Sequence, residues 1–306
     1  MYIIFLGSSA SVTVTPTSPV HHVSPLQLAE FQRELAGHPD RAKVQYVLDG
    51  IAHGFSSGFD ASRVALRSSL RNMRSATDHP VVIDEYLATE VAKGRVVGPF
   101  TTPPLPNLHC SPFGVIPKKG QPGKWQLILD LSSPHQHSVN DGIPKDPFSL
   151  QYISVDDAIK ILMVLGPGAL MAKFDVESAY RNVAMRPDER YLFGMRWRDL
   201  FFTNLALPFA LRSATFIFNS IADMVEWILR VNYAVHYLLH YLDVFLSLGP
   251  AGSSACTDSV MVARSVFSRL GLSLHPSKCE GPSPVLIFLG TSSTPLPRRL
   301  AYPTTS

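Results

Sequence analysis

The stretch His240-Tyr241-Leu242-Asp243-Val244-Phe245-Leu246 sets the architecture that this chain is expected to adopt. Apolar residues lead into it and follow it, and one carboxylate lies at its centre. The pattern predicts two short buried strands joined by a tight turn, with Asp243 at the tip. An Asp in a turn is commonly only a turn former. Inside a nearly all-apolar hairpin, however, an ionised carboxylate needs a cation or a hydrogen-bonding partner, so Asp243 is a candidate site residue.

The composition of the chain indicates a globular protein. Of its 306 residues, 46% are hydrophobic and only 17% are charged, which leaves room for a sizeable core in one large domain or two smaller ones. The formal net charge of +3 permits a nucleic-acid partner without requiring one. Local clusters of charge are therefore more informative than the total.

Cysteine usage and hydropathy bear on the compartment. The cysteines Cys110, Cys256 and Cys279 form no CxxC pair, so neither a disulfide framework nor a zinc site is predicted, and an intracellular location, cytoplasmic or nuclear, fits better. Apolar stretches over 200–218 and 231–249 approach the length of a membrane span, but both contain charged residues and turn signals. We expect buried strands and helices there, and no membrane partner.

Helical patterns are predicted in five stretches: 25–36, 61–74, 82–93, 216–230 and 258–270. The first begins with a capping box formed by Ser24 and Gln27. In the second, four arginines recur at helical spacing and would line one face: Arg63, Arg67, Arg71 and Arg74. Such a face is either a solvated surface or a phosphate-binding surface, and the sequence leaves both open.

A β-hairpin is predicted over 111–130, with a basic tip that contains Lys118, Lys119 and Lys124. Surface lysines are common, so this tip alone is weak evidence for the binding of any partner. The segments on either side of the regular patterns, 1–23 and 291–306, are rich in Ser, Thr and Pro, and we expect a loose leader and an irregular tail.

Asp175 ends a second apolar strand, predicted over 171–175. If this strand lies beside the hairpin that carries Asp243, the two carboxylates form a shared site for a divalent metal, because hard oxygen ligands hold Mg²⁺. Phosphoryl transfer uses such a site. Taken singly, each Asp is more often structural than functional, so the prediction depends on the pair.

Six sequence blocks resemble, in order, the motifs of reverse transcriptases, the RNA-directed DNA polymerases. The blocks are Lys124-Trp125 through Asp130, Phe174 to Tyr180, Leu207 to Ala214, Tyr241-Leu242-Asp243, His275 to Cys279 and Phe288-Leu289-Gly290. The pattern is most similar to the reverse transcriptases of DIRS-type retrotransposons, which carry a tyrosine recombinase. Six blocks in the family order are a far stronger signal than any single block.

The resemblance implies an α+β fold of the polymerase fingers–palm type, in which the palm has an antiparallel sheet and packed helices. It places a helical N-terminal region at 24–100, a fingers-like region with the basic hairpin at 101–160, and the palm at 161–290. The thumb and RNase H regions that the family carries after the palm have no counterpart in the 306 residues.

The resemblance also implies roles for individual residues. Asp175 and Asp243 would ligate Mg²⁺ or Mn²⁺, with the Val176 carbonyl as a further ligand. Tyr180 would be a steric gate that excludes a ribose 2′-hydroxyl. The remaining implied sites are nucleotide contacts at Lys118, Lys119, Lys124, Gln126, Phe209 and Lys278, and a primer grip at Phe288, Leu289 and Gly290. The implied partners are an RNA or DNA template-primer and deoxynucleoside triphosphates.

The sequence departs from the family pattern at four positions: Gln126, Ala210, Thr215 and Val244. Val244 matters most, because it replaces the second carboxylate of the family's Tyr-x-Asp-Asp motif with an isopropyl group. Gln126 replaces an Arg and so loses charge-assisted phosphate binding. We therefore predict weak or no polymerase activity.

Three alternatives to a working polymerase stay open. The chain is either a non-catalytic nucleic-acid-binding module, another palm enzyme such as a nucleotide cyclase, or the product of a decayed element. Glu177, expected on the same strand face as Asp175, is a candidate substitute for the lost carboxylate.

Overall fold

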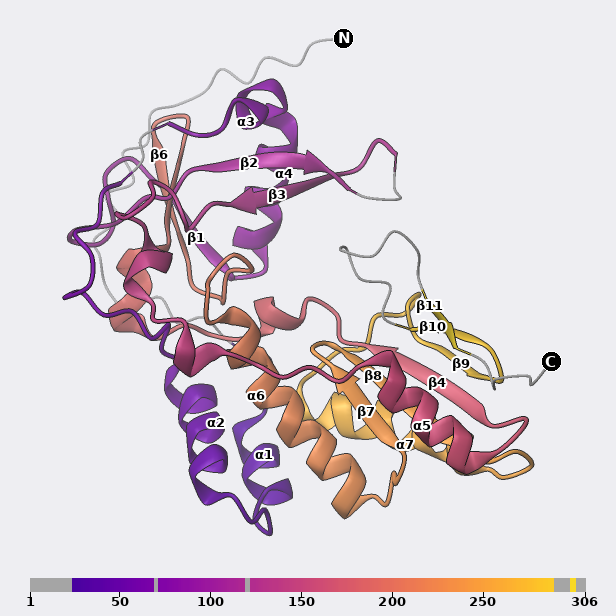
Figure 1. The fold of residues 1–306 in the computed structure, drawn as a ribbon. Coiled ribbons are helices and arrows are strands. Elements are labelled where there is room, and N and C mark those ends of the chain that lie inside the picture. The colour runs from indigo at the N-terminus through magenta and orange to yellow at the C-terminus, as the bar shows by residue number, and fades with distance from the viewer. Residues whose placement is uncertain (1–23, 69–70, 119–121, 289–297, 301–306) are drawn as a thin grey trace.

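The computed structural model describes residues 24–68, 71–118, 122–288 and 298–300 (Figure 1). The helices are α1 (Leu28–Glu34), α2 (Arg41–His53), α3 (Arg74–Asp78), α4 (Pro80–Ala92), α5 (Val155–Leu165), α6 (Ala214–Trp227) and α7 (Ala255–Leu270). The strands are β1 (Val96–Phe100), β2 (Phe113–Pro117), β3 (Trp125–Leu129), β4 (Leu170–Asp175), β5 (Gly194–Trp197), β6 (Leu200–Asn204), β7 (Leu238–Tyr241), β8 (Val244–Gly249), β9 (Glu280–Ser283), β10 (Leu286–Phe288) and β11 (Arg298–Leu300).

An antiparallel sheet of order β7-β8-β4-β9 forms the centre of the lower lobe in Figure 1. Side chains alternate between the two faces of a strand. Phe174 and Phe245 therefore point into the main core with α6 and α7, whereas Met171 and Leu246 point into a second apolar cluster that includes Leu162 of α5. Both faces are covered, which explains why β4 and β8 read as nearly continuous apolar runs.

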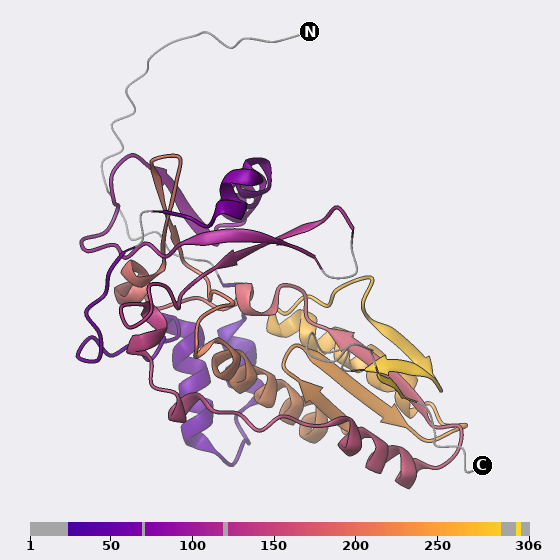
Figure 2. The ribbon, with the colours of Figure 1, turned by 45° about the horizontal axis from the view of Figure 1, so that its top comes forward.

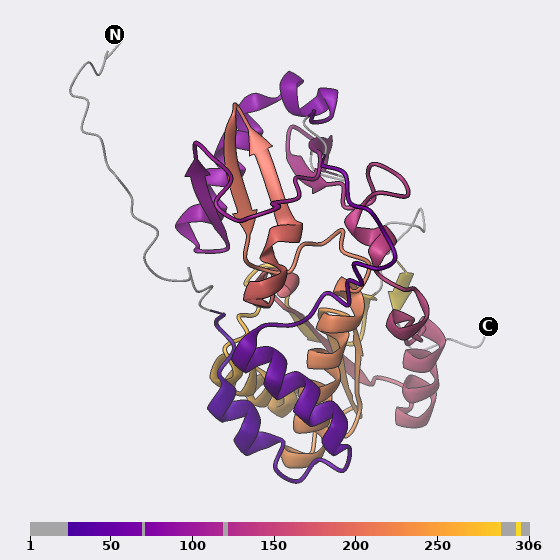
Figure 3. The same cartoon turned by 90° about the vertical axis from the view of Figure 1, so that its left-hand side faces the viewer.

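The upper lobe holds α3 and α4, the β2–β3 hairpin and a three-stranded sheet of order β1-β6-β5. The predicted hairpin over 111–130 is confirmed, with Phe113 paired to Leu129. Residues 194–204 lie in the stretch expected as palm, yet they pair with β1, not with the four-stranded sheet. In the lower lobe, α2 lies against α6, and α1 lies against α2 and α7 (Figure 3).

The helix predicted over 61–74 is wrong. Residues 61–73 form turns and extended segments, and α3 begins only at Arg74. The reason is a set of hydrogen bonds that replaces helical ones: the Ser62 amide donates to the Asp60 carboxylate, the Arg67 amide donates to the His137 carbonyl, and the Ser68 hydroxyl accepts from the Cys110 amide. Short polar side chains that bond the backbone in this way compete with a helix.

The capping box predicted at Ser24 and Gln27 is also wrong. α1 begins at Leu28, and the Ser24 hydroxyl donates instead to the Asn182 carbonyl, 2.7 Å away. The other predicted helices, over 82–93, 216–230 and 258–270, are confirmed as α4, α6 and α7. Part of the stretch expected as an irregular tail is a strand, because residues 298–300 form β11 and pair with β10.

None of the helices in the described part of the chain combines the length and the apolar character needed to cross a lipid bilayer.

A buried ion pair joins the two lobes. The Arg181 guanidinium donates through Nε to the Glu90 carboxylate of α4 at 2.9 Å, and through Nη2 to the Asn204 side chain of β6 at 3.0 Å. Both partners of the ion pair are buried. Because Arg181 belongs to the short turn Ala179–Asn182, this network fixes the segment that carries Tyr180.

Replacing Arg181 with Met is expected to lower the free energy of unfolding by about 3–5 kcal/mol, because the Glu90 charge would stay buried without its main partner. Urea unfolding of the variant measures this loss. The same replacement at Arg198, whose ion pair with Asp84 is exposed, is the matched control. It should lower the free energy of unfolding by about 0–1 kcal/mol. Equal losses in the two variants would contradict the prediction.

Candidate functional site

Asp175 and Asp243 meet where the end of β4 touches the β7–β8 turn. Asp175 is the last residue of β4, and its Cα pairs with that of Val244, the first residue of β8. The Val176 amide donates to the Asp243 carbonyl at 2.9 Å. Leu242 completes the turn in a left-handed conformation, with φ of 53°. The side-by-side strands expected from the sequence are therefore present.

The two carboxylates are close enough to affect each other. Burial raises the pKa of Asp243 above its usual range, and the negative charge of Asp175 raises it further, while Lys278 opposes the change. Two carboxylates that repel each other in a partly buried place are stabilised by any cation that binds between them. The electrostatics of the pair thus favour a cation.

Lys278 provides a cation in the structure itself. Its Nζ lies 3.1 Å from Oδ1 and 3.4 Å from Oδ2 of Asp175. Lys278 belongs to the loop between α7 and β9, and this loop is bonded to the end of β4: the His275 amide donates to the Asp175 carbonyl at 2.7 Å, and the Glu177 amide donates to the Ser273 carbonyl at 2.8 Å. The loop therefore delivers Lys278 to the carboxylates.

Val244 lies directly opposite Asp175 in the β4–β8 register. Side chains of directly paired residues share one face of a sheet, with Cβ atoms about 4.5–5.5 Å apart. Val244 is half-buried and packs against the second apolar cluster, so the fold accepts it well. Glu177 was expected on the same strand face as Asp175, where it could replace a carboxylate at position 244. It lies beyond the end of β4 and is exposed, so the alternation of side chains along a strand does not place it there.

The donor set fits one hard divalent cation better than two. Asp175 and Asp243 offer carboxylate oxygens, the ligands that Mg²⁺ prefers. Within the described residues, no group of three or more His, Cys, Asp or Glu side chains could hold a metal ion. A second ion would need a further carboxylate, and the facing position on β8 holds Val244.

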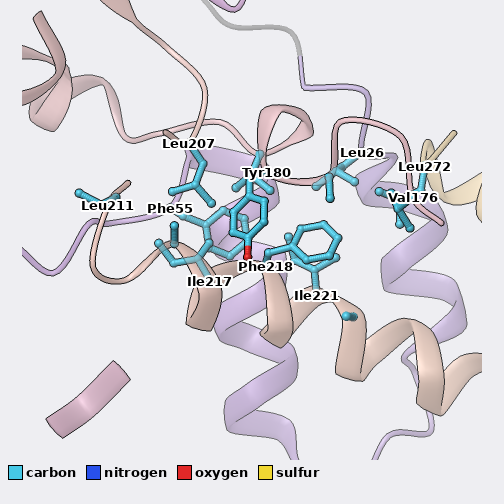
Figure 4. Close-up of a cluster of buried hydrophobic side chains, with 14 of the residues drawn as sticks. Leu26, Phe55, Val176, Tyr180, Leu207, Leu211, Ile217, Phe218, Ile221 and Leu272 are labelled. Atoms are coloured by element: carbon cyan, nitrogen blue, oxygen red, sulfur yellow. The ribbon is translucent and has the colours of Figure 1, made fainter. Parts of the chain in front are cut away.

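Tyr180 and Phe209 form an aromatic pair beside the carboxylates. Their ring centroids lie 5.1 Å apart, and Tyr180 also contacts Phe218 of α6 at 5.5 Å (Figure 4). Burial raises the pKa of the Tyr180 hydroxyl, and the Asp243 charge raises it further. Phe209 is 61% exposed, an unusual state for a large apolar ring next to a polar site.

The residues of the predicted basic hairpin lie in the upper lobe. Lys118, Lys124 and Gln126 are exposed on the β2–β3 hairpin, which projects on the side where β4 and β9 lie in the lower lobe (Figure 2). Lys119 lies outside the described residues. The hairpin is held to its own lobe, for example by the Val115 amide, which donates to the Ser75 hydroxyl at 3.1 Å.

The four arginines do not share one helix face, although all four are exposed. Arg74 starts α3 and pairs with Asp78 at 3.6 Å. Arg63 and Arg67 lie in the irregular segment that runs beside residues 137–142, where the Arg67 amide donates to the His137 carbonyl. The arginine stripe predicted from helical spacing is therefore replaced by a looser surface.

Asn140 is a positioning residue that the sequence did not reveal. Its side chain donates to the Ala210 carbonyl at 2.9 Å and accepts from the Arg212 amide at 2.8 Å, so it holds the loop that presents Phe209. The only local signal is the capping box of Ser138 and Asp141, which marks a helical turn without indicating a site.

The predicted primer grip is only partly described. Phe288 is fully buried in the second apolar cluster, so its ring is a core element and does not face solvent. Leu289 and Gly290 lie outside the described residues.

Comparison with known proteins supports the fold. No family model and no curated protein matches the sequence. Among solved structures, the chain is similar to the foamy viral protease-reverse transcriptase in complex with dsDNA (14% identity, TM-score 0.60, 87% of this chain and 54% of that chain). It is also similar to the complex with RNA/DNA hybrid (14%, TM-score 0.59, 87% and 35%) and to native prototype foamy virus protease-reverse transcriptase (17%, TM-score 0.52, 74% and 27%). The chain spans about half or less of these proteins, and its fold is reverse-transcriptase-like.

His240 anchors the hairpin that carries Asp243 to helix α6. It lies in β7, stacks on Phe245 and bonds two acids of α6: Nδ1 lies 2.6 Å from Glu226 and Nε2 lies 3.3 Å from Asp223. Burial alone would lower the pKa of His240, but these two acids raise it to about 9. The imidazolium thus fastens β7 to α6.

His240 is expected to make stability pH-dependent. Its pKa rises from 6.5 to about 9 on folding, so its contribution is fully present below about pH 6.5 and is lost as the pH rises through about 9. The contribution amounts to about 3 kcal/mol. Urea unfolding at pH 6 and pH 10 should show a difference that His240→Gln reduces and that His236→Gln, at an exposed position, retains. An unchanged difference in His240→Gln would refute this role.

Proposed function

We propose that this chain is a reverse-transcriptase-like polymerase domain of retrotransposon origin, similar to DIRS-type elements, whose catalytic step is impaired. The observation that carries the proposal is the meeting of Asp175 and Asp243 beside Tyr180, on a fold of the reverse-transcriptase type. The proposed partners are an RNA or DNA template-primer and deoxynucleoside triphosphates. The proposed location is the cytoplasm or the nucleus.

In the proposed mechanism, Asp175 and Asp243 would hold a divalent cation, Mg²⁺ or Mn²⁺, with the Val176 carbonyl as a further ligand. Such an ion would supply positive charge that lowers the barrier of phosphoryl transfer at a primer 3′-end. Tyr180, fixed against Phe218, bars a ribose 2′-hydroxyl by the volume of its ring. The exposed Phe209 ring offers a stacking surface for a base.

The proposed hairpin contacts are weaker than a full polymerase requires. Lys118 and Lys124 carry charge toward the triphosphate, whereas Gln126 contributes hydrogen bonds without charge. Val244 removes a negative charge beside Asp175, and a loss of about 3–5 kcal/mol of transition-state stabilisation slows chemistry by about 10²- to 10⁴-fold. Together these changes are expected to weaken nucleotide binding and to slow turnover.

A primer-extension assay tests the proposal. The wild-type chain, with a template-primer, deoxynucleotides and Mg²⁺ or Mn²⁺, is expected to extend weakly or not at all. Val244→Asp should raise extension by at least about 10²-fold, because it restores a carboxylate opposite Asp175. Val244→Asn, of similar size but uncharged, is the matched control and should give no such gain. Robust extension by the wild-type chain would refute the impairment.

A non-catalytic nucleic-acid-binding module is the second candidate. Arg63 and Arg67 are exposed beside residues 137–142, and Arg212 reaches the Ile143 carbonyl at the same end of the molecule. Residues 137–143 thus contact both the segment of these arginines and the loop that presents Phe209, whose Ala210 carbonyl accepts from Asn140. Phosphate contacts at such a surface require neither Asp243 nor a metal.

Replacing Arg63 and Arg67 with Gln is expected to weaken binding of single-stranded RNA or DNA. The slope of log affinity against log salt should decrease in magnitude by about 1.5. The reason is that two fewer phosphate contacts release fewer counterions when the nucleic acid binds. Fluorescence anisotropy over a range of salt concentrations measures the slope. Arg264→Gln, exposed on α7, is the control and should leave it unchanged. Salt-independent binding that survives both replacements would argue against this surface.

A further inference from the structure

The Lys278 ammonium group lies directly against the carboxylate of Asp175. Its Nζ contacts both carboxylate oxygens, at 3.1 and 3.4 Å. We propose that Lys278 is an intramolecular competitor for the divalent cation, so that a metal ion binds Asp175 and Asp243 only when the ammonium group has withdrawn. This inference rests on the proposed function, because it concerns the same pair of carboxylates.

The ion pair is asymmetric, and the asymmetry allows exchange. The Asp175 side chain is 12% exposed, whereas the Lys278 side chain is 55% exposed. A lysine stem has four flexible carbons and a compact, strongly hydrated charge. The ammonium group can therefore turn away into water without any movement of the carboxylate.

The backbone around Lys278 keeps the competitor near the site. The amides of His275 and Glu177 form the two bonds that join the loop to the end of β4, and the Lys278 amide donates to the His275 carbonyl at 3.3 Å. Withdrawal thus requires only side-chain rotation. The local concentration of the ammonium group at Asp175 stays high, and a metal ion must compete against it.

The charge balance makes this competition effective. Asp175 and Asp243 carry a formal charge of −2, which Lys278 reduces to −1, and Val244 adds nothing. A site with a carboxylate at the Val244 position would keep −2 even with the lysine in place. In this chain the lysine therefore cancels half of the charge that attracts a divalent ion.

Mn²⁺ binding, followed by the electron paramagnetic resonance signal of the free ion, tests the proposal without any need for activity. Lys278→Met is expected to bind Mn²⁺ about 3- to 5-fold more tightly than the wild-type chain. Lys278→Arg, which keeps the charge, should bind as the wild type does. Lys173→Met is the matched control: it removes a lysine from the same strand as Asp175, one that pairs with Glu280 at 2.7 Å, and should not tighten binding.

The result that would overturn the proposal is Mn²⁺ binding by Lys278→Met that is absent, equal to or weaker than that of the wild type. Thermal unfolding confirms that each variant is folded, and Lys278→Gln replaces Lys278→Met if the latter is not. The outcome is separate from that of the primer-extension assay. A gain in extension by Val244→Asp, with unchanged Mn²⁺ binding in Lys278→Met, would refute the competitor role of Lys278. It would leave the polymerase proposal in place.

Discussion

The register between β4 and β8 is the constraint on which the rest of the structure depends. Pairing of Asp175 with Val244 places the carboxylate at the end of one strand beside the turn of a hairpin that lies far away in the sequence. The same register directs Phe174 and Phe245 into the main core. A slip by one residue would move all of these side chains to the opposite face. Core packing therefore fixes the geometry of the site.

This dependence also explains why the fold accepts Val244 at the position that faces Asp175. Val244 suits a strand and packs against the second apolar cluster, so its isopropyl group satisfies the core. The fold requires a side chain that fills the space at this position. A divalent-metal site would require charge there instead. The two requirements differ at a single residue, and Val244 meets the first one.

The sequence predicted what depends on pattern and missed what depends on distant contacts. The hairpin around Asp243 and the strand ending at Asp175 were visible as apolar runs with a carboxylate. α5 was missed although Ser154 and Asp157 form a capping box. The β5–β6 turn could not be predicted from turn residues, because Arg198 and Asp199 adopt the left-handed conformations usually taken by Asn and Gly.

Lys278 is a further case in which the sequence could not predict a distant contact. A motif can indicate that a residue belongs to a site without indicating which residue it contacts. The motif indicated a lysine near a triphosphate, but only the folded loop shows that its ammonium group contacts Asp175. Two carboxylates that repel each other are stabilised by one cation, and the chain supplies that cation itself. A lysine that leaves when a metal arrives would leave Asp175 in contact with a cation in both states. The ion pair thus maintains the arrangement of the site in the absence of any ligand.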